Sequence, residues 1–164
     1  MNKNYIFDQD AAARKITRLA YEIAERNHGE NRLILAGIWQ QGAVLAQAIG
    51  DALRSITDAE IVITDVLLDK RNPGTVTLRE PVDCTNQTVI LIDDVANSGK
   101  TMLHALKPFL ELNPRTIQTL VLVERTHKKF PIQADYVGLS LSTTVEEHIY
   151  VEIADGKISG AYMA

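Results

Sequence analysis

The chain has 164 residues, of which 46% are hydrophobic and 23% charged, and its formal net charge is −4. This length and balance are typical of one globular domain with a substantial core, and the negative charge excludes a general electrostatic attraction to nucleic acid. Because no apolar run approaches a membrane span, the N-terminus is polar and the single cysteine cannot form an internal disulfide, we expect a cytoplasmic protein without a membrane partner.

Helices and strands are predicted to alternate along the first half of the chain. Asp8 or Asp10 can cap a helix that runs to about Asn27 and turns one apolar face towards a core. Gly29 follows as a typical helix stop. The hydrophobic pattern then predicts a strand, a helix and a strand, at residues 32–38, 44–53 and 60–68.

The second half continues this alternation after an interruption at residues 69–81, which are rich in turn formers and charges. An apolar run at 89–92 is typical of a parallel strand buried on both faces, and it is followed by a helix to about Leu112 and an apolar strand at 117–123. Strands that alternate with helices predict an α/β fold with a doubly wound parallel sheet, which binds ligands beyond the carboxyl ends of its strands. Three segments should meet at that edge: 37–42, 93–101 and the residues after Glu124.

Residues 89–102 contain the most informative motif, Val-Ile-Leu-Ile-Asp-Asp-Val-Ala-Asn-Ser-Gly-Lys-Thr-Met. The apolar strand ends in Asp93 and Asp94, a polar turn follows at 97–99, and a helix can begin at Lys100. The unpaired backbone N–H groups of such a turn, at the positive end of the helix dipole, form an anion cup. The two carboxylates would repel a phosphate but accept hydrogen bonds from sugar hydroxyls. The motif therefore predicts a phosphate cradle beside an anchor for a diol and a metal ion.

Two alternative interpretations of this motif need to be weighed. Gly99-Lys100-Thr101 could suggest a P-loop, but that motif requires a glycine five residues before Gly99, where this chain has Asp94. A carboxylate in a phosphate cradle is electrostatically unfavourable, so we reject a nucleoside-triphosphatase site. The other alternative is an ordinary strand–turn–helix joint with accidental acids. The acid pair and the turn after it are both suited, at every position, to binding a phosphate and a diol. This consistency favours a binding motif over an accidental joint.

The motif resembles the 5-phosphoribosyl 1-pyrophosphate (PRPP) signature of the type I phosphoribosyltransferases. Within that superfamily, the chain is similar to the pyrimidine operon attenuation regulators that are also uracil phosphoribosyltransferases. Four stretches carry this resemblance: residues 15–27, 35–38 with the following loop, 89–102 and 122–138. The resemblance implies a single phosphoribosyltransferase domain over 1–164, with a small β-containing hood from about 1–10 and 139–164. It also implies transfer of a 5-phosphoribosyl group from PRPP to a nucleobase, with release of pyrophosphate.

By this resemblance, the acid pair and the turn after it hold PRPP. Asp93 and Asp94 are catalytic residues that take the ribose hydroxyls directly or through Mg²⁺, which is the implied cofactor. The hydroxyls of the turn add hydrogen-bond donors, and its glycine lets the backbone come close to the ligand. The residues that take the 5′-phosphate are Ala96, Asn97, Ser98, Gly99, Lys100 and Thr101.

The pyrophosphate loop is expected at Trp39, Gln40, Gln41 and Gly42, and here the chain departs from the family. Relatives usually carry Thr-Arg-Gly where this chain has Gln40-Gln41-Gly42. Replacing an arginine clamp by a neutral amide removes a charge-assisted contact worth about 1.5–3 kcal/mol, which leaves a PRPP-binding protein with little activity as an alternative. Trp39 could instead be a buried packing residue. Arg125, just past the long strand, is assigned to the pyrophosphate or the base.

Residues 69–81 stand at the place of the flexible catalytic lid, and they form a shorter lid than that of the attenuation regulators. Lys70, Arg71 and Arg79 could reach pyrophosphate when the lid closes, and we assign a catalytic role to Arg71 and Arg79. The alternative is a solvated loop whose charges have no function.

The choice of base is implied by two positions. Asn97 stands where purine-using relatives carry a third carboxylate, and it cannot act as a general base. Gln133 stands where those relatives carry a lysine and the attenuation regulators an arginine. Both absences favour uracil or another pyrimidine. Tyr136 is expected to stack on the base, beside polar backbone groups of Val137, unless Tyr136 is a core aromatic.

Two kinds of macromolecular partner remain open. Residues 14–18 include three basic side chains that could serve an RNA-binding attenuator, but Glu22 and Glu146-Glu147 interrupt a continuous basic face, so RNA is disfavoured. A single small sheet would leave some apolar residues exposed within 44–53 and 61–68. Such exposed apolar residues predict a homodimer or a higher homo-oligomer. Their inclusion in the core of a single chain is the alternative.

Overall fold

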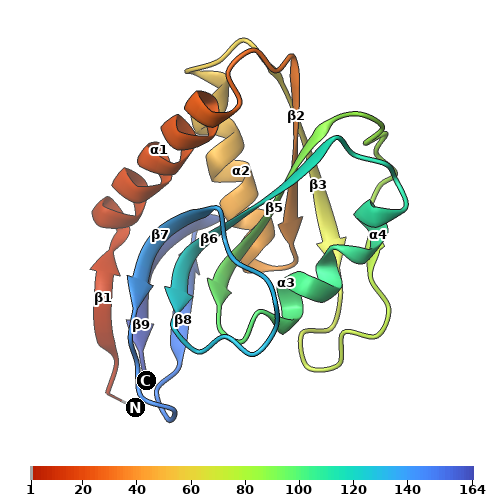
Figure 1. Ribbon diagram of the computed structural model, residues 1–164. Coiled ribbons are helices and arrows are strands. Elements are labelled where there is room, and N and C mark those ends of the chain that lie inside the picture. The colour runs from red at the N-terminus through yellow and green to blue at the C-terminus, as the bar shows by residue number, and fades with distance from the viewer. Residues whose placement is uncertain (1) are drawn as a thin grey trace.

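The computed structural model describes residues 2–164 (Figure 1). The strands are β1 (Asn4–Asp8), β2 (Arg32–Ile38), β3 (Glu60–Leu67), β4 (Thr77–Leu78), β5 (Thr88–Ala96), β6 (Thr116–Arg125), β7 (Tyr136–Leu141), β8 (Ile149–Ala154) and β9 (Lys157–Met163). The helices are α1 (Gln9–Arg26), α2 (Gln41–Arg54), α3 (Lys100–Ala105) and α4 (Lys107–Leu110). The strands form a six-stranded sheet in the order β4-β3-β2-β5-β6-β7 and a three-stranded sheet in the order β1-β9-β8.

The six-stranded sheet is parallel except for the short edge strand β4, and it confirms the predicted doubly wound α/β fold. Helices α1 and α2 cover one face, and α3 and α4 cover the other (Figure 1). The central strand β5 is buried from Thr88 to Asp94 because it has a strand on each side and helices on both faces. Its alternate residues serve two cores, with Ile90 in the α1–α2 layer and Leu91 in the α3–α4 layer.

The first helix begins and ends where the sequence predicts. Asp8 is its N-cap, and Oδ1 of Asp8 accepts a hydrogen bond from the N–H of Ala11 at 2.9 Å. Leu19 and Ile23 lie fully buried on the apolar face. The helix ends at Arg26, with Asn27 as its C-cap.

The helix predicted after the turn is in fact two short helices. α3 ends at Ala105 and α4 begins at Lys107, instead of one helix reaching Leu112. Pro108 explains the break, because its ring has no N–H to donate and collides with the carbonyl four residues earlier in a continuous helix.

The small sheet joins the two ends of the chain. β9 pairs antiparallel with both β1 and β8, so residues near the N-terminus lie beside the last strand (Figure 1). We expected the C-terminal part of this hood to begin at 139, but Leu139 and Leu141 pair with β6 as part of β7, and the small sheet takes up the chain at Ile149. Within residues 2–164, no helix is long and apolar enough to cross a membrane.

Candidate active site

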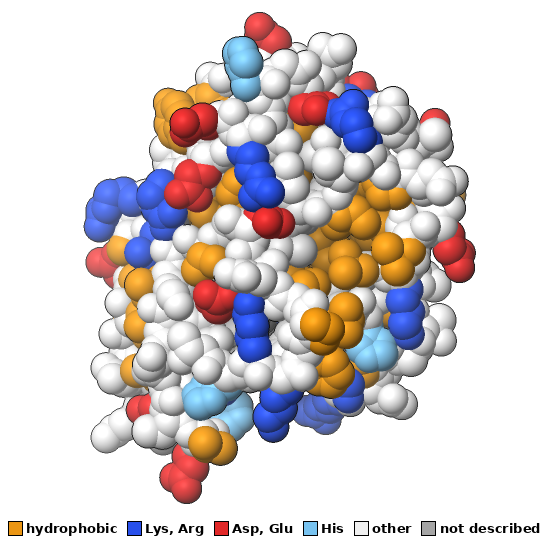
Figure 2. Space-filling model, in the orientation of Figure 1, with side chains coloured by type: hydrophobic (Ala, Val, Ile, Leu, Met, Phe, Trp, Pro, Cys, Tyr) orange, Lys and Arg blue, Asp and Glu red, His pale blue; other side chains and the backbone are white. Residues whose placement is uncertain are grey.

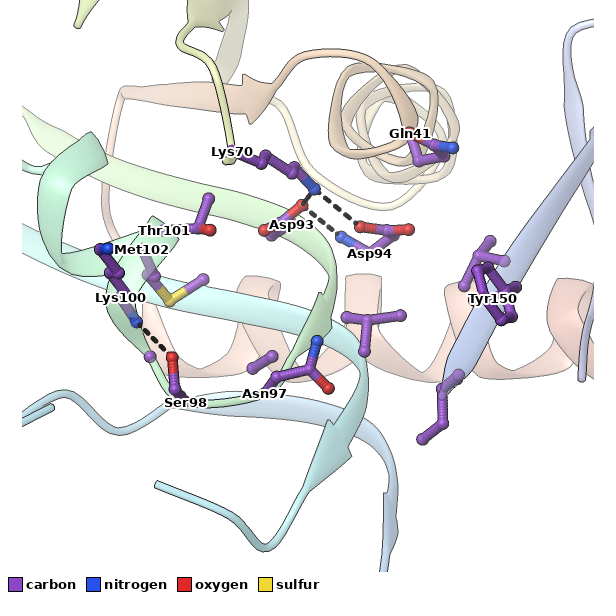
Figure 3. Close-up of a pocket in the computed structure, with 15 residues that line it drawn as sticks. Gln41, Lys70, Asp93, Asp94, Asn97, Ser98, Lys100, Thr101, Met102 and Tyr150 are labelled. Carbon is purple, nitrogen blue, oxygen red and sulfur yellow. Dashed lines mark hydrogen bonds and ion pairs between the residues drawn. The ribbon is translucent and has the colours of Figure 1, made fainter. Parts of the chain in front are cut away.

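A cavity of about 340 Å³ opens at the carboxyl edge of the main sheet, where β5 ends and α2 and α3 begin (Figure 3). Its walls come from three parts of the fold: the end of β5 with the turn after it, the start of α2, and β8 of the small sheet. The residues that line it are Gln41, Lys70, 93–102 and 149–151. All the residues that the sequence assigns to the ribose and the 5′-phosphate are therefore on one cavity wall.

The turn between β5 and α3 is held in a defined shape. Gly99 has a φ of 88°, which glycine adopts at no steric cost. A Cβ at this position would lie 2.7 Å from Cγ2 of Ile132, so the neighbouring segment packs too closely for any other residue. The carbonyl of Ser98 accepts hydrogen bonds from the N–H groups of Lys129 and Phe130, at 2.9 and 3.0 Å. These contacts fix the turn from outside the cavity.

The acid pair lies at the base of the cavity, with Asp93 2% and Asp94 7% exposed. Oδ1 of Asp93 accepts a hydrogen bond from the N–H of Asp94 at 2.9 Å. The ammonium of Lys70 lies 2.9 Å from Oδ1 of Asp93 and 3.3 Å from Oδ1 of Asp94 (Figure 3). Burial, and then the charge of Asp94, raise the pKa of Asp93, although Lys70 opposes this shift. Burial lowers the pKa of Lys70, but both carboxylates raise it, and the balance lies above the ordinary lysine value.

The donor set of this pair fits Mg²⁺. Carboxylate oxygens are among the ligands that Mg²⁺ prefers, and the ammonium of Lys70 shows that a cation can contact both carboxylates at once. Within residues 2–164 there is no group of three or more His, Cys, Asp or Glu side chains that could hold a metal ion. Asp93 and Asp94 alone leave most of an octahedral shell to other oxygens, so a metal ion here would share its ligands with a phosphate-bearing substrate.

The loop from β2 to α2 reaches the cavity through Gln41. Gly42 packs so closely on β5 that a Cβ there would lie 2.7 Å from the carbonyl oxygen of Ile92. Trp39 and Gln40, which are joined by a cis peptide bond, precede this contact and do not line the cavity. Trp39 is 42% exposed, so it is not the buried packing residue of the alternative interpretation.

Only one of the three basic residues considered for the lid lies at the acid pair, and it is Lys70. Arg71 is exposed, and Arg79 pairs with Asp65 through Nε and Oδ2 at 2.9 Å. Neither arginine lines the cavity in this conformation, so their assigned catalytic roles stay predictions. The assignment of catalytic residues omitted Lys70, because the sequence of the segment does not distinguish its three basic side chains.

Arg125 is a buried bridge between two walls of the site. Its guanidinium donates to Oγ1 of Thr143 at 2.7 Å and to the carbonyl of Thr144 at 2.8 Å. A third hydrogen bond, at 3.3 Å, reaches Oδ1 of Asn97 in the turn. Arg125 therefore joins the turn to the segment that leads into β8, and it does not line the cavity where pyrophosphate was expected.

The residues expected to bind the base are not at the cavity. Strand β7 is parallel to β6 and begins at Tyr136, so Gln133, Tyr136 and Val137 lie at the amino edge of the sheet, away from the carboxyl ends. Tyr136 is buried, and its hydroxyl donates to Oε1 of Gln118 at 2.6 Å. Tyr136 is thus a core aromatic, and the assignment of these three residues to the base is wrong.

Strand β8 supplies the wall that sequence reasoning missed. Ile149, Tyr150 and Val151 line the cavity, and Tyr150 lies across it from the acid pair and the turn (Figure 3). Tyr150 is 43% exposed and stacks on Tyr162 of β9, with ring centroids 5.2 Å apart. An apolar and aromatic wall facing a phosphate cup is suited to the flat, weakly polar faces of a nucleobase. The family resemblance implied only a small β-containing hood within 139–164, and it did not show that a strand of this hood faces the turn.

Comparison with known proteins agrees with this geometry. Residues 3–155 match the family described as the phosphoribosyl transferase domain. The chain is 37% identical over 167 residues to the bifunctional protein PyrR of Ligilactobacillus salivarius, covering 93% of each chain. It is 36% identical over 160 residues to the bifunctional protein PyrR of Streptococcus agalactiae, covering 94% of this chain and 92% of the relative.

Solved structures share the fold at low sequence identity. A hypoxanthine-guanine phosphoribosyltransferase from Bacillus anthracis superposes with a TM-score of 0.78 at 19% identity, covering 100% of this chain and 99% of the other. A hypoxanthine phosphoribosyltransferase from Trypanosoma cruzi superposes with a TM-score of 0.80 at 16% identity, covering 98% of this chain and 94% of the other. The matched sequence, the relatives and the fold lead to one conclusion: this chain belongs to the phosphoribosyltransferase family, with relatives among the bifunctional PyrR proteins.

Proposed function

We propose that the protein transfers the 5-phosphoribosyl group of PRPP to a pyrimidine base, uracil, and releases pyrophosphate, as a cytoplasmic enzyme of nucleotide salvage. One observation carries this proposal: a single cavity contains the turn after β5, the buried acid pair and the apolar wall of β8. The turn is suited to the phosphate of a nucleotide, the acid pair to the ribose diol, and the apolar wall to the base.

The chemistry asked of these residues is mainly positional. Cleavage at the anomeric carbon develops positive charge on the sugar, as glycosidic cleavage does, so the ribose must be held rigidly while the leaving group departs. In the proposed complex, the backbone and hydroxyls of 97–101 hold the 5′-phosphate, and Asp93 and Asp94 accept hydrogen bonds from the ribose hydroxyls. Bound with PRPP, Mg²⁺ would supply charge neutralisation to the departing pyrophosphate. Gln41, at the start of α2, offers a neutral amide to the same group.

Uracil is the proposed base because, by the family resemblance, purine-using relatives carry a carboxylate for proton transfer at the position of Asn97. Asn97 lines the cavity as part of the turn after β5, and its amide cannot act as a general base. The proposal of uracil therefore depends on Asn97 alone, because Gln133 lies at the other edge of the sheet.

The test is a turnover assay with PRPP, Mg²⁺ and each of uracil, hypoxanthine and guanine. We expect uridine monophosphate to form and the purine nucleotides to form poorly. A preference for a purine would refute the choice of base. Inertness towards every base, with PRPP still bound, would favour the alternative of a binding protein with little activity.

A second candidate is an RNA-binding regulator, favoured by the word bifunctional in the names of the relatives. The structure gives it limited support. Arg18, one of the basic residues considered for RNA, pairs with Glu22 at 3.0 Å and donates to the carbonyl of Gly138 at 2.6 Å. Electrophoretic mobility shift with the leader RNA of a pyrimidine operon, at several salt concentrations, would test it.

A further inference from the structure

We propose that Lys70 is a displaceable counter-cation of the acid pair, which occupies the metal position in the free protein so that a divalent cation enters together with PRPP and not alone. The inference rests on the proposed function for the identity of the incoming ligand. Its test, however, uses the free protein and a metal ion, and needs no turnover.

The geometry places one ammonium against the two oxygens that a metal ion would use. Nζ of Lys70 lies 2.9 Å from Oδ1 of Asp93 and 3.3 Å from Oδ1 of Asp94. Among residues 2–164, no other Lys, Arg or His side chain lies within ion-pair distance of either carboxylate. A divalent cation bound between the same oxygens would stand within a few ångströms of this ammonium. Binding of the two cations is therefore mutually exclusive.

The two sides of this contact differ in how firmly the fold holds them. The side chains of Asp93 and Asp94 are 3% and 10% exposed and belong to the central strand β5, whereas the side chain of Lys70 is 38% exposed. Lys70 lies between β3 and β4, outside any helix or strand. The ammonium can therefore leave the carboxylates without breaking a ladder of backbone hydrogen bonds, while the carboxylates stay in place.

Lys70 also reduces the electrostatic repulsion between Asp93 and Asp94 when no ligand is bound. Two carboxylates in adjacent buried positions repel each other, and a nearby cation offsets this repulsion. A lone divalent ion would have to displace that cation and then find only two protein carboxylates as ligands. A metal complex of PRPP arrives with phosphate oxygens already in its shell, so it can exchange for Lys70 at less cost. The released ammonium remains in a cavity that also contains Gln41, on the side proposed for pyrophosphate.

Mn²⁺ binding to the free protein tests this inference, measured by the electron paramagnetic resonance signal of the unbound ion. Lys70→Met removes the counter-cation and should tighten Mn²⁺ binding about tenfold or more without PRPP, because charge-assisted contacts to both carboxylates no longer compete. Lys70→Arg keeps the charge and should bind Mn²⁺ as weakly as the unaltered protein. Lys157→Met, at the exposed start of β9, changes the net charge equally and should have no effect.

Equal Mn²⁺ affinity in the Lys70→Met and Lys157→Met proteins would overturn the proposal. So would tight binding that survives Asp93→Asn in the Lys70→Met background, since the ion would then lie elsewhere. If Lys70→Met does not fold, Lys70→Gln provides a neutral, polar replacement of similar length and carries the same expectation. A tenfold change in Mn²⁺ affinity in a protein that transfers no phosphoribosyl group would support the counter-cation and refute the proposed function alone.

Discussion

Arg79 lies over the ring of Trp39, with its guanidinium carbon 4.5 Å from the ring centroid. The same side chain donates through Nε to Oδ2 of Asp65 at 2.9 Å. Trp39 belongs to the loop that leads to Gln41, and Arg79 belongs to the lid segment 69–81. A cation–π contact therefore connects the two parts of the chain that are proposed to hold pyrophosphate.

This contact makes Trp39 a reporter of pyrophosphate binding. Trp39 is the only tryptophan of the chain, so its fluorescence is assigned without ambiguity. If Arg79 turns from the ring to the ligand, adding pyrophosphate with Mg²⁺ should shift the emission of the unaltered protein. In Arg79→Ala the shift should disappear and the affinity for pyrophosphate should fall about tenfold. Arg115→Ala, which removes another half-exposed arginine, is the control. An identical shift in the Arg79→Ala protein would show that Arg79 takes no part.

Replacing both acids should abolish PRPP binding. Asp93→Asn combined with Asp94→Asn keeps the side-chain shape but removes two charge-assisted contacts of about 1.5–3 kcal/mol each, a loss of more than about 100-fold in affinity. Calorimetric titration with PRPP and Mg²⁺ measures this loss, and circular dichroism checks the fold. Asp155→Asn, in the turn between β8 and β9, is a matched control, because asparagine tolerates its φ of 52°. Unchanged affinity in the double variant would remove Asp93 and Asp94 from the site.

Gln41→Arg should raise turnover. Gln41 lines the cavity at the start of α2, and its amide offers pyrophosphate only neutral hydrogen bonds. A guanidinium at this position would strengthen contacts to the charge that develops on the leaving group, which favours the transition state over bound substrate. One such contact corresponds to about a tenfold increase in kcat. A loss of activity in a well-folded Gln41→Arg protein would show that the loop has adapted to glutamine.

The free energy of unfolding of the ligand-free protein should fall as the pH rises towards 8. Burial first, and then the charge of Asp94, raise the pKa of Asp93 from 3.8 to about 8. Between these two values the folded chain retains a proton that the unfolded chain has released, so stability decreases with pH across this window. Asp93→Asn removes the titrating group and should flatten the profile. Urea unfolding at a series of pH values measures both slopes, and equal slopes would contradict the assignment.

A homodimer or a higher homo-oligomer stays our prediction for the assembly. Leu45, Ile49 and Leu53 of α2 are fully buried in the core of one chain, whereas Ile61, Val62 and Ile63 of β3 are only half-buried. Hydrophobic side chains also gather on the face in front of α3 and α4 (Figure 2). A groove of about 380 Å³ lies on α4 and the lid segment, lined by Val76, Leu78, Pro81, Val82, Lys107, Pro108, Glu111 and Leu112. Light scattering that gave 18.2 kDa, the mass of one chain, at every concentration would refute self-association.

The sequence predicted the four inner strands of the main sheet, β3, β2, β5 and β6, because each depends on local pattern, but it did not predict the edge strands β4 and β7. Strand β2 has the predicted bounds, Arg32–Ile38, and the apolar run before Asp93 lies on the central strand as expected. The turn at 97–99 was also predictable, since its glycine, its polar residues and the acid pair before it are contiguous in the chain.

Features that depend on distant pairing were not predictable in this way. An aromatic residue at the start of a strand gives the same sequence pattern whether it packs in a core or stacks on a ligand. Only the parallel pairing of β7 with β6 shows that Tyr136 lies at the amino edge of the sheet, away from the cavity. Ile149 and Tyr150 reach the cavity because β8 pairs with β9 at the far end of the chain. The selection of Lys70 from three neighbouring basic residues likewise depends on the path of the chain after β3.

The bridge made by Arg125 has a consequence for any attempt to redesign the specificity of this protein. Asn97 in the phosphate turn and the Thr143–Thr144 segment before β8 share one buried guanidinium. Grafting a foreign segment before β8, to admit a larger base, would release one end of that bridge and loosen the grip on the sugar phosphate. Under the proposed function, a change in the wall offered to the base would therefore also change the affinity for PRPP. A successful graft would have to transplant the partners of Arg125 together with the new wall.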